Sequence, residues 1–128
     1  MIQRFVELGE GFSDLYELLQ ITRTNKERLH RIIRLDTVID GKKVCSIVVV
    51  LNPVEPGNYM PCYICREGIP HPEERKTGRY TLIDQLVDEL KTELCRLVVK
   101  PSTEFNELEL YYQYLIGVLR MNKFIPNP

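Results

Sequence analysis

Two β-rich runs joined by a two-residue turn constrain the fold of this chain more than any other feature. The runs cover residues 29–39 and 42–51, and Asp40-Gly41 lies between them. Asp-Gly favours the tight hairpin turn in which both central residues take a positive φ. The register that follows places Thr37 opposite Val44, Leu35 opposite Ser46, and Ile33 opposite Val48. The sequence therefore predicts an antiparallel hairpin.

The hairpin register divides the side chains between two faces of a sheet. One face is apolar and is predicted to be a core face: Leu29, Ile33, Leu35, Ile39, Val44, Val48 and Val50. The other face sets His30, Arg34 and Asp36 of the first strand beside Cys45, Ile47, Val49 and Leu51 of the second. The second strand is apolar on both sides and is predicted to be central. The first strand carries charge on one side, so we place it nearer an edge.

The remaining segments predict strands mixed with helices. Strands are expected at 2–8, 58–67 and 96–100, with a loop at 68–78. Helices are expected at 14–24 after a Ser13 cap, from a Thr81 cap onward, and from a Ser102 or Thr103 cap to about residue 122. The order is β-α-β-β-β-α-β-α. This order predicts one α+β domain over residues 1–128, with three helices and a mainly antiparallel sheet of about five strands.

Composition limits the classes of partner. The 128 residues carry a formal net charge of -1, which removes the broad attraction on which most nucleic-acid and membrane-surface binders rely. The first residues have no apolar signal region, and the longest apolar run is far too short to span a bilayer. The 4 cysteines then suggest reduced thiols. We expect a cytoplasmic protein that binds neither nucleic acid nor membrane.

The Cys62-Tyr-Ile-Cys65 pattern is the first candidate for chemistry. A redox pair needs a strand-to-helix turn, whereas this pair lies in a predicted strand, where residues three apart point to opposite faces. A zinc site would need Cys45, Cys95 or a histidine to converge on the pair. We predict structural cysteines and expect neither a metal nor another cofactor.

Two groups of polar residues are candidates for ligand binding. His30, Arg34 and Asp36 are spaced to share one strand face, and the 71–79 loop holds His71, Arg79 and charges of both signs. The alternatives are a solvated face of an edge strand and a solvated connection. Either group could serve a small enzyme or a ligand-binding protein whose ligand the sequence does not identify.

The order of elements over residues 13–100 is similar to the core of the PD-(D/E)xK nuclease-like fold. Asp36 lies roughly where that family carries its first acidic residue. The family's acidic and lysine positions on the next strand fall at Val48-Val49-Val50, which cannot hold Mg²⁺. The sequence also lacks phosphate-binding glycine loops and the HExxH and GxSxG motifs. Enzymatic activity is therefore not expected.

The final helix is the best candidate for a contact with a partner. Phe105, Leu108, Tyr112, Leu115, Ile116 and Leu119 form one stripe at helical spacing. Tyr111, Tyr114 and Val118 extend the apolar character to a second side, which a helix covering a small sheet does not need. The alternative is that the tyrosines only cap the core. We predict Tyr111, Tyr114 and Val118 as interface residues of a homodimer.

Three segments carry a resemblance to a known family: Glu7-Leu-Gly-Glu-Gly, Tyr63-Ile-Cys-Arg-Glu-Gly-Ile69 and Glu109-Leu-Tyr-Tyr-Gln-Tyr-Leu-Ile-Gly117. With these segments the chain resembles a small family of uncharacterised proteins from Bacillus-type Firmicutes. The resemblance implies a bacterial cytosolic protein and brings no catalytic residues. The sequence thus favours a non-enzymatic binding or regulatory module that self-associates, with a small enzyme or ligand-binding protein as the alternative. If the Cys45–Leu51 face stays uncovered within one chain, pairing of two copies would cover it.

Overall fold

The computed structural model describes residues 3–7, 13–54, 60–65 and 67–126. The strands are β1 (Gln3–Glu7), β2 (Leu29–Ile39), β3 (Lys42–Leu51), β4 (Met60–Ile64), β5 (Ile69–Pro70) and β6 (Leu94–Val98). The α-helices in these residues are α1 (Ser13–Thr24), α2 (Gly78–Glu89) and α3 (Leu108–Met121), and Lys26–Arg28 and Ser102–Glu104 form short 3-10 helices. The predicted α+β class with three helices is confirmed.

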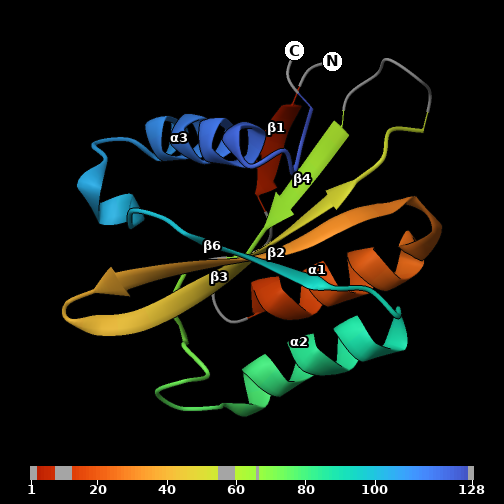
Figure 1. Ribbon diagram of the computed structural model, residues 1–128, viewed down its shortest axis with the longest axis horizontal. Coiled ribbons are helices and arrows are strands. Elements are labelled where there is room, and N and C mark those ends of the chain that lie inside the picture. Colours follow the sequence, from red (N-terminus) through yellow and green to blue (C-terminus); the bar gives the residue numbers. More distant parts are fainter. Residues whose placement is uncertain (1–2, 8–12, 55–59, 66, 127–128) are drawn as a thin grey trace.

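The described strands form one mixed sheet in the order β1-β4-β3-β2-β6, with the two-residue β5 also paired to β3 (Figure 1). The pairs β2–β3, β3–β4 and β3–β5 are antiparallel. The pairs at the two ends, β1–β4 and β2–β6, are parallel. The sheet is therefore mainly antiparallel, as predicted, with a parallel strand at each end.

The β2–β3 hairpin has the predicted register. Thr37 pairs with Val44, Leu35 with Ser46, and Ile33 with Val48. Asp40 and Gly41 have φ values of 52° and 77°, the positive angles that a tight hairpin turn requires. Since this turn is set by local residues, its chemistry was sufficient to predict the register.

The prediction that β2 lies near an edge is wrong. β6 pairs with β2 from Ile32 to Asp36, so β2 has a neighbour on each side. Of the polar residues that suggested an edge, Arg34 is buried at 4% exposed and Asp36 is half-buried, whereas His30 is exposed. Arg34 is buried because Asp36 on the same strand binds its charge and Tyr80, 46 residues further along the chain, accepts another of its hydrogen bonds.

A β-bulge between Leu29 and Arg31 corrects the predicted faces of β2. Leu29 packs with the residues under α1 and α2, whereas Ile33 and Leu35 belong to the cluster under α3. Because the bulge adds one residue to β2, side chains before it do not keep the alternation that holds after it. Leu29 is therefore not on the face on which the simple alternation placed it.

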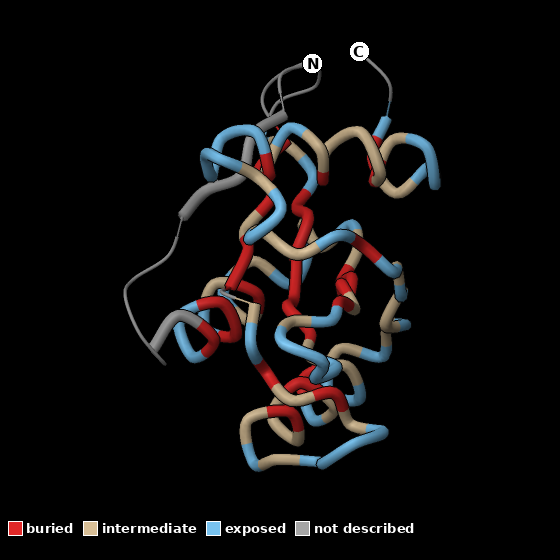
Figure 2. The backbone as a smooth tube through the Cα atoms, turned by 90° about the vertical axis from the view of Figure 1, so that its left-hand side faces the viewer, coloured by how far each residue is buried: buried red, intermediate tan, exposed pale blue. Residues whose placement is uncertain are grey.

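Helices cover both faces of the sheet, so the molecule has three layers (Figure 1). Under α1 and α2 lies a buried cluster that includes Cys45, Ile47, Val49 and Leu51. On the other face, α3 packs over Ile33, Leu35, Val48, Val50 and their neighbours. Figure 2 shows the buried segments concentrated in the strands and in the sides of the helices that face them. The Cys45–Leu51 face is covered within one chain and needs no second copy to bury it.

Several predicted boundaries need correction. The loop predicted at 68–78 contains β5, and the strand predicted at 96–100 begins at Leu94. The cap of α2 is Thr77, whose Oγ1 accepts a hydrogen bond from Tyr80 N at 3.2 Å, and not Thr81. Ser102 and Thr103 lie in a 3-10 helix, and Glu107 precedes α3. The cap predicted at Ser13 concerns a side chain outside the described residues.

Candidate functional site

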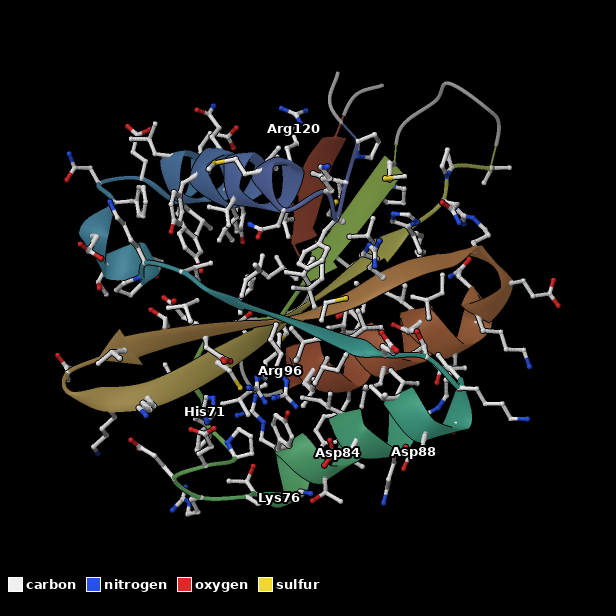
Figure 3. The ribbon with its side chains drawn as sticks, viewed as in Figure 1. His71, Lys76, Asp84, Asp88, Arg96 and Arg120 are labelled. Carbon is white, nitrogen blue, oxygen red and sulfur yellow. The ribbon has the colours of Figure 1, made fainter. Side chains whose placement is uncertain are left out.

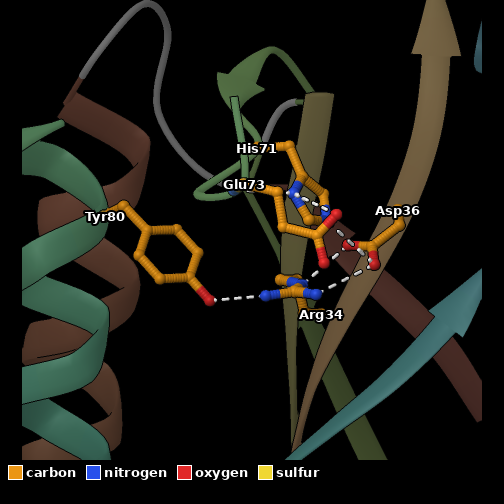
Figure 4. Close-up of polar contacts among 5 residues, drawn as sticks. All are labelled: Arg34, Asp36, His71, Glu73 and Tyr80. Carbon is orange, nitrogen blue, oxygen red and sulfur yellow. Dashed lines mark hydrogen bonds and ion pairs between the residues drawn. The ribbon is translucent and has the colours of Figure 1, made fainter. Parts of the chain in front are cut away.

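A polar cluster joins three separate parts of the chain on the α2 side of the sheet (Figure 4). Arg34 and Asp36 come from β2, His71 follows β5, and Tyr80 lies in the first turn of α2. Arg34 Nε and Nη2 donate to the two carboxylate oxygens of Asp36 at 2.7 and 3.0 Å. Arg34 Nη1 donates to the Tyr80 hydroxyl at 2.8 Å. The cluster thus fastens the start of α2 to the sheet.

Electrostatics keeps Arg34 charged inside the protein. Burial alone would lower the pKa of Arg34, but hydrogen bonds to Asp36 and Tyr80 outweigh it and raise this pKa above its ordinary value. A guanidinium that binds a carboxylate through two parallel hydrogen bonds is among the stronger charged pairs in proteins. Arg34 and Asp36 therefore satisfy each other, and neither charge needs a ligand.

Both ring nitrogens of His71 lie against polar groups of the chain. Its Nδ1 accepts from Glu73 N at 3.1 Å, and its Nε2 lies 3.3 Å from Asp36 Oδ2. Because Nδ1 accepts from Glu73 N, its lone pair is engaged, and Nε2 faces the Asp36 carboxylate. The ring is also only 5% exposed. A general base needs an accessible nitrogen lone pair, and the geometry leaves none on His71.

Of the other two predicted ligand-binding residues, His30 lies apart from this network. His30 is exposed beside the bulge. Its pKa is lowered, mainly by burial of part of the ring and then by the charge of Arg31, and a hydrogen bond with the Phe124 backbone offsets only part of this decrease. Phe124 packs against the α3 cluster, on the opposite face from Arg34. Arg79 is half-buried at the start of α2, next to Tyr80. The structure thus unites Arg34, Asp36 and His71 but separates His30 from them.

Exposed basic and acidic side chains surround the cluster. Arg96 of β6 pairs in register with Arg34, is exposed, and lies on the same side of the sheet as His71 and α2 (Figure 3). Lys76 and Asp84 form an ion pair of 2.7 Å at the outer side of the loop and α2. These charges are solvated, so they have limited energetic weight individually. The surface around the cluster therefore carries charges of both signs and has no uniformly positive or negative potential.

The cysteines are placed as structural residues. Cys62 and Cys65 point to opposite faces of the sheet, as their spacing in a strand predicts. Burial raises the pKa of the Cys62 thiol to about 12, and burial followed by the Asp36 charge raises that of Cys45 to about 12. Such thiols are protonated and unreactive at neutral pH. Among the described residues, no group of His, Cys, Asp or Glu side chains is arranged to hold a metal ion.

The predicted interface residues of α3 differ in burial. Tyr111 is buried in the core beneath the helix, and its ring lies 5.6 Å from that of Phe105. Tyr114 and Val118 are half-buried at the side of α3, and the Tyr114 hydroxyl accepts from Lys100 N at 3.0 Å. Tyr111 therefore belongs to the core of its own chain, whereas Tyr114 and Val118 border the surface.

An apolar stripe on α3 with exposed ends was not predicted from the sequence, apart from its member Tyr114. We define the α3 stripe as Leu110, Tyr114, Gly117 and Met121, whose spacings of four, three and four place them on one side of the helix. Leu110 is 44% and Met121 83% exposed. Apart from the two chain neighbours and the adjoining helix backbone, no atom of the described residues lies within 4 Å of where a Cβ would be at Gly117. The spacing itself was the signal that would have revealed this stripe.

Tyr80 and Glu67 were also missed. Tyr80 was outside the predicted helix because the helix was begun too late, at Thr81. The carboxylate of Glu67 accepts from the Ser102 backbone N at 3.2 Å and also contacts the Ser102 hydroxyl, so it holds the segment before α3. Because these partners are 35 residues apart, no local pattern links them.

The fold defines a three-layer α+β protein, and sequence comparison supplies its family. Residues 1–125 match a family described as domain of unknown function (DUF7147), and the chain belongs to this family. The predicted resemblance to a family without an assigned function is therefore confirmed, while the bacterial source stays a prediction. Searches found no matching curated protein and no matching solved structure. Among the described residues no helix has the length and apolar character needed to cross a membrane.

Proposed function

We propose that this chain is a non-enzymatic interaction module that self-associates. The observation that carries the proposal is the α3 stripe, in which Met121 is 83% exposed although α3 covers the core with its opposite side. Large apolar side chains exposed on one side of a helix that already covers a core are commonly a site of protein contact. Within the stripe Tyr114 is half-buried, and the half-buried Val118 borders it on the side of the core.

The polar cluster supports a structural role more than a catalytic one. His71 has no accessible lone pair for proton abstraction, and the carboxylate of Asp36 is occupied by Arg34. The alternative function, ligand binding at this cluster or the 71–79 loop, draws support from the meeting of Arg34, Asp36 and His71. A ligand would have to displace hydrogen bonds that the chain already makes, which lowers its net binding energy.

The proposal is tested by the mass of the protein in solution, measured by size exclusion with light scattering over a range of concentrations. Wild-type protein should be a dimer that dissociates on dilution. Met121→Glu should raise the dissociation constant at least about 30-fold, because a charge would enter an apolar contact at the interface. The variant should remain folded, since the side chain is exposed.

Val98→Glu is the matched control, because Val98 on β6 is 84% exposed, nearly the same as Met121. This control should leave the dimer unchanged. If Val98→Glu dissociates the dimer and Met121→Glu does not, self-association occurs at the β6 edge and the α3 stripe is not the contact. A wild-type monomer at every concentration would contradict the proposed function.

A further inference from the structure

The α3 stripe has the pattern by which two helices pack side by side. Leu110 and Gly117 are seven residues apart, and so are Tyr114 and Met121, which gives two alternating positions per two turns. In an antiparallel pair of helices, a residue of one of these two positions packs beside a residue of the other position on the second helix. Leu110 then faces Met121 of the second helix, and Gly117 faces the outward edge of Tyr114, whose hydroxyl stays bonded to Lys100 N of its own chain.

Gly117 gives a second reason for a close helix contact. Glycine is the least favourable residue in a helix interior apart from proline. Here no atom of the described residues beyond the two chain neighbours and the adjoining helix backbone lies within 4 Å of the position its Cβ would take. Packing inside the chain therefore does not require glycine at this position. A tyrosine ring from another helix would need the space that a larger side chain at 117 would fill.

The charges of α3 select the direction of pairing. Exposed Glu107 and Glu109 lie at its beginning, whereas Arg120 and Lys123 lie at or after its end. Arg120 extends from α3 away from the sheet (Figure 3). An antiparallel pair brings the acidic beginning of one helix to the basic end of the other and opposes the two helix dipoles. A parallel pair would bring like charges together.

We propose that α3 packs antiparallel against α3 of a second copy, with Gly117 allowing close approach across the stripe. This inference rests on the proposed self-association and specifies its geometry. The helix has 14 residues, so the contact is about 21 Å long. One helix pair of this length buries less than the roughly 800 Å² per partner of a standard interface, so we expect a dissociation constant in the micromolar range.

Disulfide trapping tests the geometry. Leu110→Cys and Met121→Cys in one chain cannot join within that chain, because 11 residues of helix separate them by about 16 Å. In the antiparallel pair, the introduced thiol at position 110 of each copy would meet the one at position 121 of the other. Mild oxidation of the double variant should give a covalent dimer on a non-reducing gel, while each single variant should stay monomeric. Wild-type protein controls for the 4 native cysteines.

Other outcomes separate this inference from the proposed function. If each single variant cross-links by itself, equal positions meet and the pairing is parallel, which overturns the inference. If no variant cross-links although the wild-type mass in solution is that of a dimer, the copies associate through another surface and the proposed function stands without this geometry. A monomeric wild type contradicts both. Circular dichroism of the reduced variants verifies that they are folded.

Discussion

At the scale of single residues, the buried charge of Arg34 explains the arrangement around it. A guanidinium removed from water is costly unless its donors are satisfied. Asp36 and Tyr80 accept three of its hydrogen bonds, and Nε2 of His71 lies 3.3 Å from the same carboxylate that Arg34 binds. The network thus neutralises the charge and joins β2, the loop after β5, and α2.

Replacing Asp36 by Asn should destabilise the fold strongly. The change removes the negative charge and leaves Arg34 buried without its counterion, at a cost of about 3 kcal/mol in the free energy of unfolding. Urea denaturation of wild type and variant measures this difference. Asp40→Asn is the control, because Asp40 is exposed in the hairpin turn with φ of 52°, which Asn tolerates well. Equal stabilities of Asp36→Asn and wild type would contradict a closed ion pair.

At the scale of elements, local chemistry determined what the sequence could predict. The β2–β3 register follows from two residues, Asp40 and Gly41, that need positive φ in the tight turn. The start of α2 was predicted wrongly because Thr77 and Thr81 are both plausible caps and Gly78 disfavours the earlier start. The contact of Tyr80, in the first turn of α2, with Arg34 of the sheet accompanies the earlier start, and no local pattern predicts this contact.

The candidate site likewise could be predicted from local sequence patterns only in part. Arg34, Asp36 and His71 were each identified from the sequence, in two separate groups. Their meeting depends on β5 and α2 bringing the 71–79 loop against β2, which no local spacing encodes. The bulge before Arg31 likewise moved His30 away from the site, because one added residue changes the alternation of side chains along a strand.

Two threonine substitutions test the boundary of α2. Thr77→Ala should lower the free energy of unfolding by about 1 kcal/mol, because it removes the acceptor for Tyr80 N. Thr81→Ala should change it by less than about 0.5 kcal/mol, because Thr81 lies inside the helix, where alanine is a better helix former. Thermal or urea unfolding of the two variants gives both values. The reverse order of effects would mean that the helix begins at Thr81.

At the scale of the whole molecule, each face of the sheet is covered within one chain. The apolar face of β3, whose exposure would have called for a second copy, is buried under α1 and α2. The case for self-association therefore moves from the sheet to the outer side of α3. Its glycine there costs roughly 1 kcal/mol in helix stability relative to alanine, which contact with a partner would offset.

Native mass spectrometry of the unmodified protein, purified without added metal or chelator, tests the central claim most directly. It reports the number of subunits and any retained metal or small molecule in one spectrum. At a concentration above the expected micromolar dissociation constant, we predict a dimer whose mass equals twice that of the chain. A monomer carrying a bound metal or metabolite would contradict the self-associating module and would support a ligand-binding protein or enzyme instead.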